Sequence, residues 1–217
     1  MKYDLQSHGF GWRAHLLDCF RKSPIQGDIY QFGVADGFSL QVIGHMMKEI
    51  PATPNYYGFD VFTGMPKEEI EPDKQRDAPG CFKLVEMQGA TDLPEAMKTL
   101  QSDIESNMRP GAKLTLIQGL VQETLTDDLA VRYFMRPARY IDMDMDIYSP
   151  TKFALEWLVK SKLIVPGTVI GFDDWGQCPE HPIGSYGESR AWKEMGIKST
   201  LLGETAHGQI AFTVQKI

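Results

Sequence analysis

Carboxylates cluster at the ends of two apolar runs in the second half of the sequence. They are Asp142, Asp144 and Asp146 in the first run, and Asp173 and Asp174 in the second. Because carboxylates are costly inside a protein unless a cation offsets their desolvation, the two groups together imply a charge-neutralising centre. A hard divalent metal is the simplest such centre, and Mg²⁺ is favoured because neither run contains His or Cys.

Asp146 also has a purely structural interpretation. Ser149 followed by Pro150 is typical of a helix N-cap and a first-turn proline, and Asp146 would then favour the positive end of that helix. Two acidic clusters that each end a predicted strand favour a functional site instead. Along an extended strand Asp142, Asp144 and Asp146 share one face, but the strand is expected to end near Asp144, which is therefore the preferred ligand.

The spacing of the first cluster excludes a calcium-binding EF-hand. That loop needs glycine where Ile147 stands and a bidentate glutamate where Phe153 stands. A phosphatase-like aspartyl nucleophile or a sugar-nucleotide-binding Asp-x-Asp would also place a metal here. Neither would explain the glycine turn and Asp60, which lie upstream.

The glycine turn follows a predicted strand, residues 28–34, and precedes a predicted helix, residues 40–49. Gly33 and Gly37 let a ligand approach the backbone, while the helix that begins near Ser39 presents N–H groups to a carboxylate or phosphate. On this stretch alone, a structural turn and a ligand-binding loop are both open.

Ala35 stands at the second glycine position of the G-x-G-x-x-G dinucleotide fingerprint, which favours a ligand smaller than a pyrophosphate. The next predicted strand, residues 55–60, ends in Asp60, where nucleoside-binding folds place a carboxylate that holds the ribose. Asp60 is therefore a candidate ribose ligand. The alternative is a turn-forming aspartate ahead of Thr63 and Gly64.

Strand and helix patterns alternate five times along the chain. The predicted strands are residues 28–34, 55–60, 113–119, 139–144 and 167–172, and the predicted helices are residues 40–49, 92–107, 122–129, 151–161 and 188–195. This alternation predicts an α/β fold with a parallel sheet covered on both faces. Residues 197–202 and 209–214 predict a closing hairpin.

The 217 residues suit one α/β domain with a sizeable core. Within the N-terminal segment 1–26, apolar residues at helical spacing predict a covering helix over residues 11–20. Residues 61–91 show little periodicity and contain scattered prolines, so we interpret this long connection as a lid.

A formal net charge of -7 and the lack of dense Lys/Arg runs argue against a nucleic-acid partner. The three cysteines are widely spaced, as expected for a reduced cytosolic protein. No stretch has the pattern of a signal peptide or the length of a membrane span, so we expect a cytoplasmic protein without a membrane partner. The sequence leaves homo-oligomerisation open.

Several stretches, in their order along the chain, resemble the macrocin O-methyltransferase family. They are residues 30–39 (YQFGVADGFS), 58–66 (GFDVFTGMP), 144–151 (DMDIYSPT), 172–175 (FDDW) and 187–191 (GESRA). The resemblance runs from about Tyr30 to Phe212. It implies a Rossmann-like class I S-adenosylmethionine fold with a mostly parallel seven-stranded sheet, and Mg²⁺-dependent methylation of a small molecule's hydroxyl, typically on a natural-product sugar.

The resemblance also implies individual roles. The cofactor-binding residues would be Gly33, Ala35, Asp36, Gly37, Ser39, Asp60, Gly119 and Leu120, with Gly33, Ala35 and Ser39 on the methionine part, Asp60 on the ribose, and Gly119 and Leu120 near the adenine. The metal ligands would be Asp144, Asp173 and Asp174, and Asp144 could also take the hydroxyl proton. Two positions depart from the family: Gln31 replaces a glutamate, and Leu120-Val121 replaces a more aromatic pair.

Elementary chemistry is consistent with these roles. An alcohol is a poor nucleophile at neutral pH, and a metal at its oxygen lowers its pKa and aligns it with the sulfonium methyl. A second hydroxyl would complete the metal's octahedron, so vicinal diols are the natural acceptors. The alternatives are methylation of a catechol-like phenol and, from another class, a module that binds S-adenosylmethionine without turnover.

Overall fold

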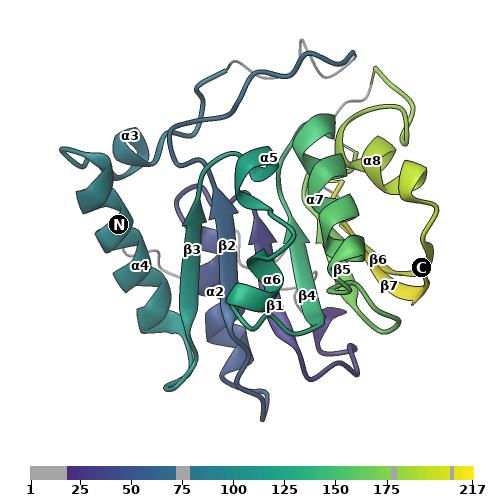
Figure 1. Ribbon diagram of the computed structural model, residues 1–217, viewed down its shortest axis with the longest axis horizontal. Coiled ribbons are helices and arrows are strands. Elements are labelled where there is room, and N and C mark those ends of the chain that lie inside the picture. The colour runs from purple at the N-terminus through teal and green to yellow at the C-terminus, as the bar shows by residue number, and fades with distance from the viewer. Residues whose placement is uncertain (1–18, 72–78, 177–179, 206–207) are drawn as a thin grey trace.

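The computed structural model describes residues 19–71, 79–176, 180–205 and 208–217. In this part of the chain, seven strands form one sheet in the order β3-β2-β1-β4-β5-β7-β6 (Figure 1). The strands are β1 (Asp28–Phe32), β2 (Tyr56–Asp60), β3 (Leu114–Gln118), β4 (Ala138–Met143), β5 (Val169–Phe172), β6 (Lys198–Glu204) and β7 (Ile210–Lys216). The first five are parallel, and β7 is antiparallel to both β5 and β6, which confirms the predicted sheet and hairpin.

Helices cover both faces of this sheet. The described helices are α2 (Phe38–Met47), α3 (Leu84–Gln88), α4 (Leu93–Asn107), α5 (Val121–Thr124), α6 (Leu129–Arg132), α7 (Tyr148–Lys160) and α8 (Gly187–Met195). On β1, Ile29 packs in the core beneath α2 and α4, while Tyr30 and Phe32 pack in the core beneath α5 to α8. Because neighbouring side chains of a strand point to opposite faces, β1 is buried on both sides.

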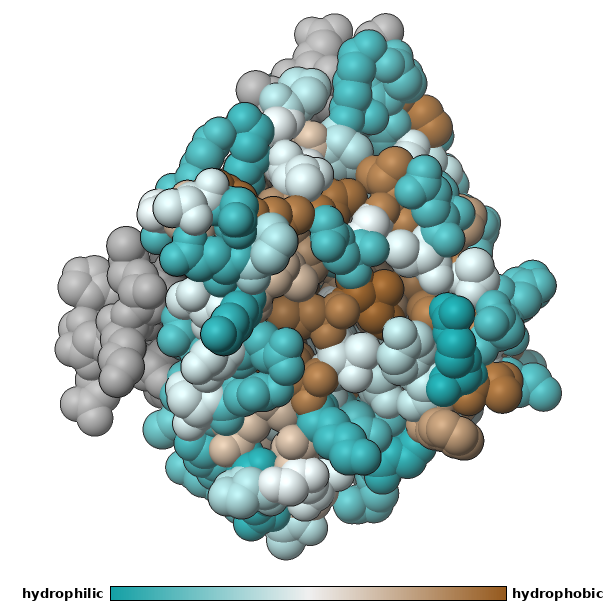
Figure 2. Space-filling model, turned by 60° about the vertical axis from the view of Figure 1, so that its left-hand side comes forward, coloured by the Kyte–Doolittle hydropathy of each residue, from teal (hydrophilic) through white to brown (hydrophobic). Residues whose placement is uncertain are grey.

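The edge strand β3 is less buried than the central strands. Its first four residues are partly exposed and its last is exposed. The face of the molecule on which β3 lies is turned forward in Figure 2, where hydrophobic residues gather in the middle with hydrophilic residues around them. By contrast, β1 and β4 lie in the middle of the strand order and are fully buried.

Two predictions about helices need correction, and a third falls almost entirely on residues that the structure does not describe. The predicted helix at residues 122–129 is two short helices, α5 and α6, because Thr126 donates its hydroxyl to Asp128 in the turn between them (2.6 Å) and so competes with helix formation. Ile147, not Ser149, is the N-cap residue of α7. The predicted N-terminal helix at residues 11–20 lies outside the described residues except for its last two.

The described helices do not include one long and apolar enough to cross a membrane. The predicted lid connection contains the short helix α3, and residues 72–78 of it lie outside the described part of the chain. Asp60 ends β2 just before this connection, and α4 follows it. The connection therefore begins at the edge of the sheet where the candidate ligand residues lie.

Asp92→Ala is expected to lower the free energy of unfolding by about 1 kcal/mol, because the side chain caps α4. Asp92 Oδ1 accepts a hydrogen bond from the Glu95 amide at 2.9 Å. Urea unfolding of both proteins measures the loss. Lys98→Ala on the exposed face of the same helix is the control and should change stability by less than about 0.5 kcal/mol. Equal effects of the two substitutions would contradict the capping role.

Candidate active site

A cavity of about 390 Å³ opens at the carboxyl ends of the parallel strands. The connections after β1 and β4 lead to opposite sides of the sheet, and open α/β sheets bind ligands in the crevice this leaves. Most of the predicted site residues line the cavity: Gly33, Ala35, Asp60, Gly119, Leu120, Asp144, Asp173 and Asp174. The strand order places the predicted cofactor residues after β1, β2 and β3 and the acids after β4 and β5.

Asp60 ties the end of β2 to the turn after β1. Its Oδ2 accepts from the amides of Val34 (2.7 Å) and Ala35 (2.9 Å), and its Oδ1 accepts from the Phe62 amide (2.7 Å). A carboxylate offers about four acceptor positions, so one is left for a ligand hydroxyl. The carboxylate thus acts first as the clamp of the turn and has capacity for one further bond.

Gly33 lets the β1 turn and the end of β4 touch backbone to backbone. Its φ is +81°, and a Cβ at this position would lie 1.7 Å from the carbonyl oxygen of Asp144. The Asp144 amide in turn donates to Phe32 O at 2.9 Å. The glycine turn is therefore required by the contact that fixes Asp144, in addition to any ligand it binds.

Three residues that were assigned to the cofactor do not line the cavity. Asp36 Oδ1 accepts from the Phe38 amide (3.1 Å) at the start of α2, and Ser39 is buried in that helix. A Cβ on Gly37 would lie 2.5 Å from a methyl group of Leu100 on α4. In this structure these residues set the position of α2 behind the turn.

Gln31 lies below the turn in β1 and is almost fully buried. Its Nε2 donates to the Gly33 carbonyl at 2.8 Å, while its Oε1 has no hydrogen-bond partner among the described residues.

At the far end of the cavity the Gly119 amide donates to Asp60 O at 2.9 Å, and Leu120 is 37% exposed. This end therefore presents backbone and an apolar side chain, as a flat aromatic ligand would need.

Three carboxylates meet at the other end of the cavity. Asp144, Asp146 and Asp174 each have an oxygen within 4.8 Å of the others. Asp173 lines the cavity but is not in this group, and its Oδ1 accepts from Gln209 Nε2 at 2.7 Å. Asp142 is buried in β4, where the Tyr140 hydroxyl donates to it at 3.0 Å. The geometry thus adds Asp146 to the predicted Asp144 and Asp174.

A tight turn brings Asp146 into the group. Its φ is +61°, and the Ile147 amide donates to the Met145 carbonyl across it at 2.6 Å, which makes a γ-turn of the rare positive-φ kind. Such conformations cost about 1–3 kcal/mol and occur preferentially at functional sites. Sequence spacing could not reveal this turn, because it depends on where β4 ends.

Glu188 is a site residue that sequence reasoning noted only as part of a motif. It lies in the first turn of α8 and is fully buried, with its two oxygens accepting from the amides of Met145 and Asp174 at 3.0 Å each. Burial, and then the charges of Asp174 and Asp144, raise the pKa of Glu188 well above its usual value, although the backbone hydrogen bonds act in the opposite direction. Four carboxyl groups therefore share one small region.

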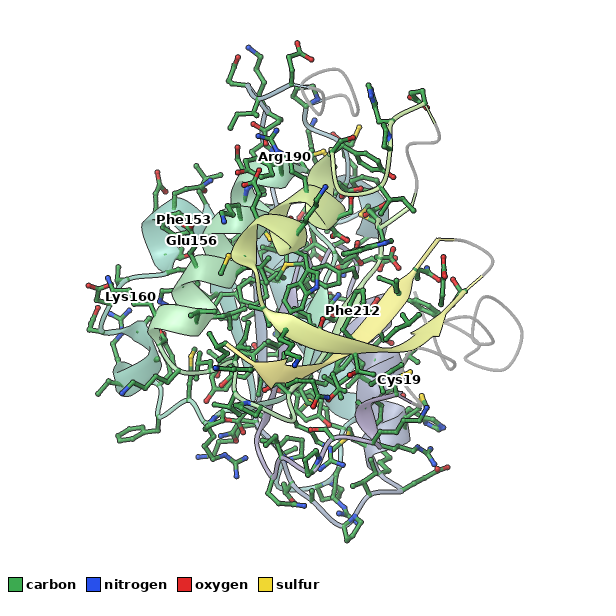
Figure 3. All side chains as sticks on the ribbon, turned by 90° about the vertical axis from the view of Figure 1, so that its right-hand side faces the viewer. Cys19, Phe153, Glu156, Lys160, Arg190 and Phe212 are labelled. Carbon is green, nitrogen blue, oxygen red and sulfur yellow. The ribbon has the colours of Figure 1, made fainter. Side chains whose placement is uncertain are left out.

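The described part of the connection between β2 and α3 crosses above the strand ends toward α7 and α8 (Figure 1). The Met65 amide donates to Cys81 O (2.8 Å) and the Gly80 amide donates to Met65 O (2.9 Å). These two hydrogen bonds hold the beginning and the later part of the connection together. Glu68, which is 7% exposed, accepts from the amide and hydroxyl of Ser149 on α7 at 2.8 and 2.9 Å. Arg190 of α8, which is labelled in Figure 3, donates to Glu71 O at 3.1 Å.

Comparison of the sequence with protein-family models and with curated proteins finds no match. The fold is similar to that of CalS11, a calicheamicin methyltransferase, with a TM-score of 0.71, 22% identity, and coverage of 96% of this chain and 80% of that one. A second CalS11 structure, named as a TDP-rhamnose 3'-O-methyltransferase, has a TM-score of 0.61, 21% identity and coverage of 96% and 81%.

The O-methyltransferase NovP is similar with a TM-score of 0.69, 14% identity and coverage of 96% and 81% of the two chains. The S-adenosylhomocysteine-bound methyltransferase PaMTH1 of Podospora anserina has a TM-score of 0.50, 12% identity and coverage of 94% and 77%. At these identities the likeness concerns the fold. The chain has the Rossmann-like methyltransferase fold, as predicted.

Proposed function

We propose that this protein is an S-adenosylmethionine-dependent O-methyltransferase that uses a divalent cation such as Mg²⁺. Its acceptor would be a hydroxyl of a small molecule, a natural-product sugar or another vicinal diol. One observation carries the proposal: a single cavity has a glycine turn and Asp60 at one end and the carboxylates of Asp144, Asp146 and Asp174 at the other. The names of the structurally similar proteins are consistent with it.

The cavity has the properties that S-adenosylmethionine needs. Its volume of about 390 Å³ falls in the range of small-molecule sites. Asp60 has acceptor capacity for a ribose hydroxyl, Gly33 and Ala35 of the glycine turn line the cavity wall beside it, and Gly119 and Leu120 would border the adenine. When bound, the cofactor would supply a methyl group activated by the sulfonium charge.

The acid cluster fits a hard cation. Its donors are carboxylate oxygens only, which suit Mg²⁺ better than a thiophilic metal, and three of them already lie within 4.8 Å of one another. Asp144, Asp146 and Asp174 would hold the ion, and Asp173 lies beside them on the cavity wall. When bound, the ion would favour the ionised form of an acceptor hydroxyl.

The chain's own residues would then have separate tasks. Asp144 lies at the centre of the strand ends and is our candidate for accepting the hydroxyl proton. Met65, Phe82 and Met87 of the lid line the cavity and would exclude water from the reacting groups. Since methyl transfer requires the donor carbon and the acceptor oxygen in line, the main contribution of the protein is alignment.

The direct test is methyl transfer from labelled S-adenosylmethionine to a panel of vicinal diols, sugars and catechols, with and without a chelator. Transfer to a sugar diol that stops with chelator and returns with Mg²⁺ supports the proposal. Transfer to catechols alone would favour the phenol alternative. Tight cofactor binding without transfer to any acceptor would favour a binding module.

Glu68→Ala is expected to loosen the lid, because it removes two hydrogen bonds between the lid and the first turn of α7. Hydrogen bonds to charged groups contribute about 1.5–3 kcal/mol, so amide exchange in residues 61–71 should accelerate by about 10- to 100-fold. Hydrogen–deuterium exchange with mass spectrometry measures this, and we also expect a higher KM for the acceptor.

The control for the lid is Glu69→Ala, which removes a neighbouring carboxylate that pairs with Lys67 on the surface. Exposed pairs of this kind contribute about 0–1 kcal/mol, so exchange should change little. Identical exchange in the Glu68 variant and the unmodified protein would show that Glu68 does not hold the lid.

A further inference from the structure

Glu188 connects the two loops that carry the acid cluster. Its Oε1 accepts from the amide of Met145, which lies between Asp144 and Asp146, and its Oε2 accepts from the amide of Asp174 itself. One side chain therefore holds the backbone of the whole cluster: Asp174 through its own amide, and Asp144 and Asp146 through the amide of Met145 between them.

Glu188 is itself held in place by the packing of α8. Trp192, one turn further along the helix, packs on Phe172 (5.3 Å between ring centroids) and on Phe212 (5.9 Å), which is labelled in Figure 3. Ser189 accepts from the Gly184 amide and donates to Tyr186 O, both at 2.9 Å, which fixes the start of the helix. The carboxylate thus spans the two loops from a rigid base.

We propose that Glu188 is a positioning residue that sets the distance between the β4 and β5 loops and thereby the affinity of the Asp144, Asp146 and Asp174 cluster for a divalent cation. This inference rests on the metal site of the proposed function. A fully buried carboxylate behind three others is costly by itself, and a cation in front of the cluster offsets that cost. Groups that orient metal ligands in this way typically change metal affinity by about 10- to 100-fold when altered.

The test uses Mn²⁺ as a paramagnetic probe and measures its dissociation constant by electron paramagnetic resonance on the full chain. E188Q keeps the side-chain length but places an amide donor against a backbone N–H. E188D keeps the charge but is one methylene shorter and cannot reach both amides. We expect both variants to bind Mn²⁺ about 10- to 100-fold more weakly than the unmodified protein.

Two further variants and a second ligand complete the design. E156Q removes an exposed carboxylate from α7 (Figure 3) and should leave Mn²⁺ affinity unchanged. D144N should abolish Mn²⁺ binding at the cluster. Affinity for S-adenosylhomocysteine, measured by calorimetry, should stay within about threefold in the Glu188 variants, which shows that they are folded. E188D carries the test alone if E188Q does not fold.

The outcomes separate the two proposals. If D144N loses Mn²⁺ while E188Q and E188D keep it within threefold, Glu188 is not a positioning residue and the proposed function stands. If only E188Q weakens binding, the charge matters and the span does not, which also overturns the positioning role. If D144N binds Mn²⁺ as tightly as the unmodified protein, the cluster is not the ion site and both proposals fail.

Discussion

Replacing Asp144 with asparagine is expected to lower kcat/KM for methyl transfer by about 10²- to 10⁴-fold, the range that a lost proton acceptor usually costs. The change keeps the size of the side chain and the backbone contact between the Asp144 amide and Phe32. The loss should therefore be chemical rather than structural. Initial rates with labelled S-adenosylmethionine over a range of diol acceptor concentrations, from below KM upward, measure it.

Three comparisons sharpen this result. Asp127→Asn, at an exposed acid that pairs with Lys160, should leave the rate unchanged. Asp146→Asn should weaken divalent-cation activation more than Asp173→Asn, because only Asp146 lies in the three-carboxylate group. Full activity of Asp144→Asn, or full activity in chelator, would exclude the metal-assisted mechanism.

Gly33→Ala is expected to destabilise the fold by about 1–3 kcal/mol more than a matched glycine substitution, because overpacking of the contact adds to the backbone strain that both substitutions share. The added Cβ would lie 1.7 Å from the Asp144 carbonyl oxygen, so the end of β4 must move. Urea unfolding followed by circular dichroism measures the difference in free energy of unfolding.

Gly111→Ala is the matched control. Its φ of +89° is close to the +81° of Gly33, but a Cβ there would have no atom within 4 Å. It should cost only the strain of a left-handed alanine, about 1–2 kcal/mol. If the two substitutions cost the same, the contact between the β1 turn and β4 does not constrain the structure.

Alternation of short β-rich runs with helical patterns was sufficient to predict the sheet and its hairpin. The strands from Asp28, Tyr56 and Leu114 begin within one residue of prediction, because turn-forming residues precede each of them. Where propensity competes with local side-chain bonds the prediction failed, as at Thr126, whose hydroxyl interrupts a helix-like sequence.

The acid site could be predicted only in part. The positions of Asp144 and Asp174 could be predicted because each residue comes just after a strand, where the sheet sets the position of the backbone. Asp146 depends on a γ-turn that follows β4, and Asp173 points to Gln209, which precedes β7 and lies far along the chain. Glu188 reaches the site from a helix fourteen residues after Asp174, and no strand pattern points to it.

The strand pairing at the crevice also has a kinetic consequence. β1 pairs with β4, and Asp28 lies beside Ala138 in this pair. The long stretch of chain between these two residues must therefore close into a loop before the pair can form. Closing so long a loop costs entropy before the contacts repay it, which slows folding. The pairing of β1 with β4, at the end of which the candidate site lies, is therefore expected to form late in refolding. The rate of refolding from denaturant should report on the formation of this strand pair.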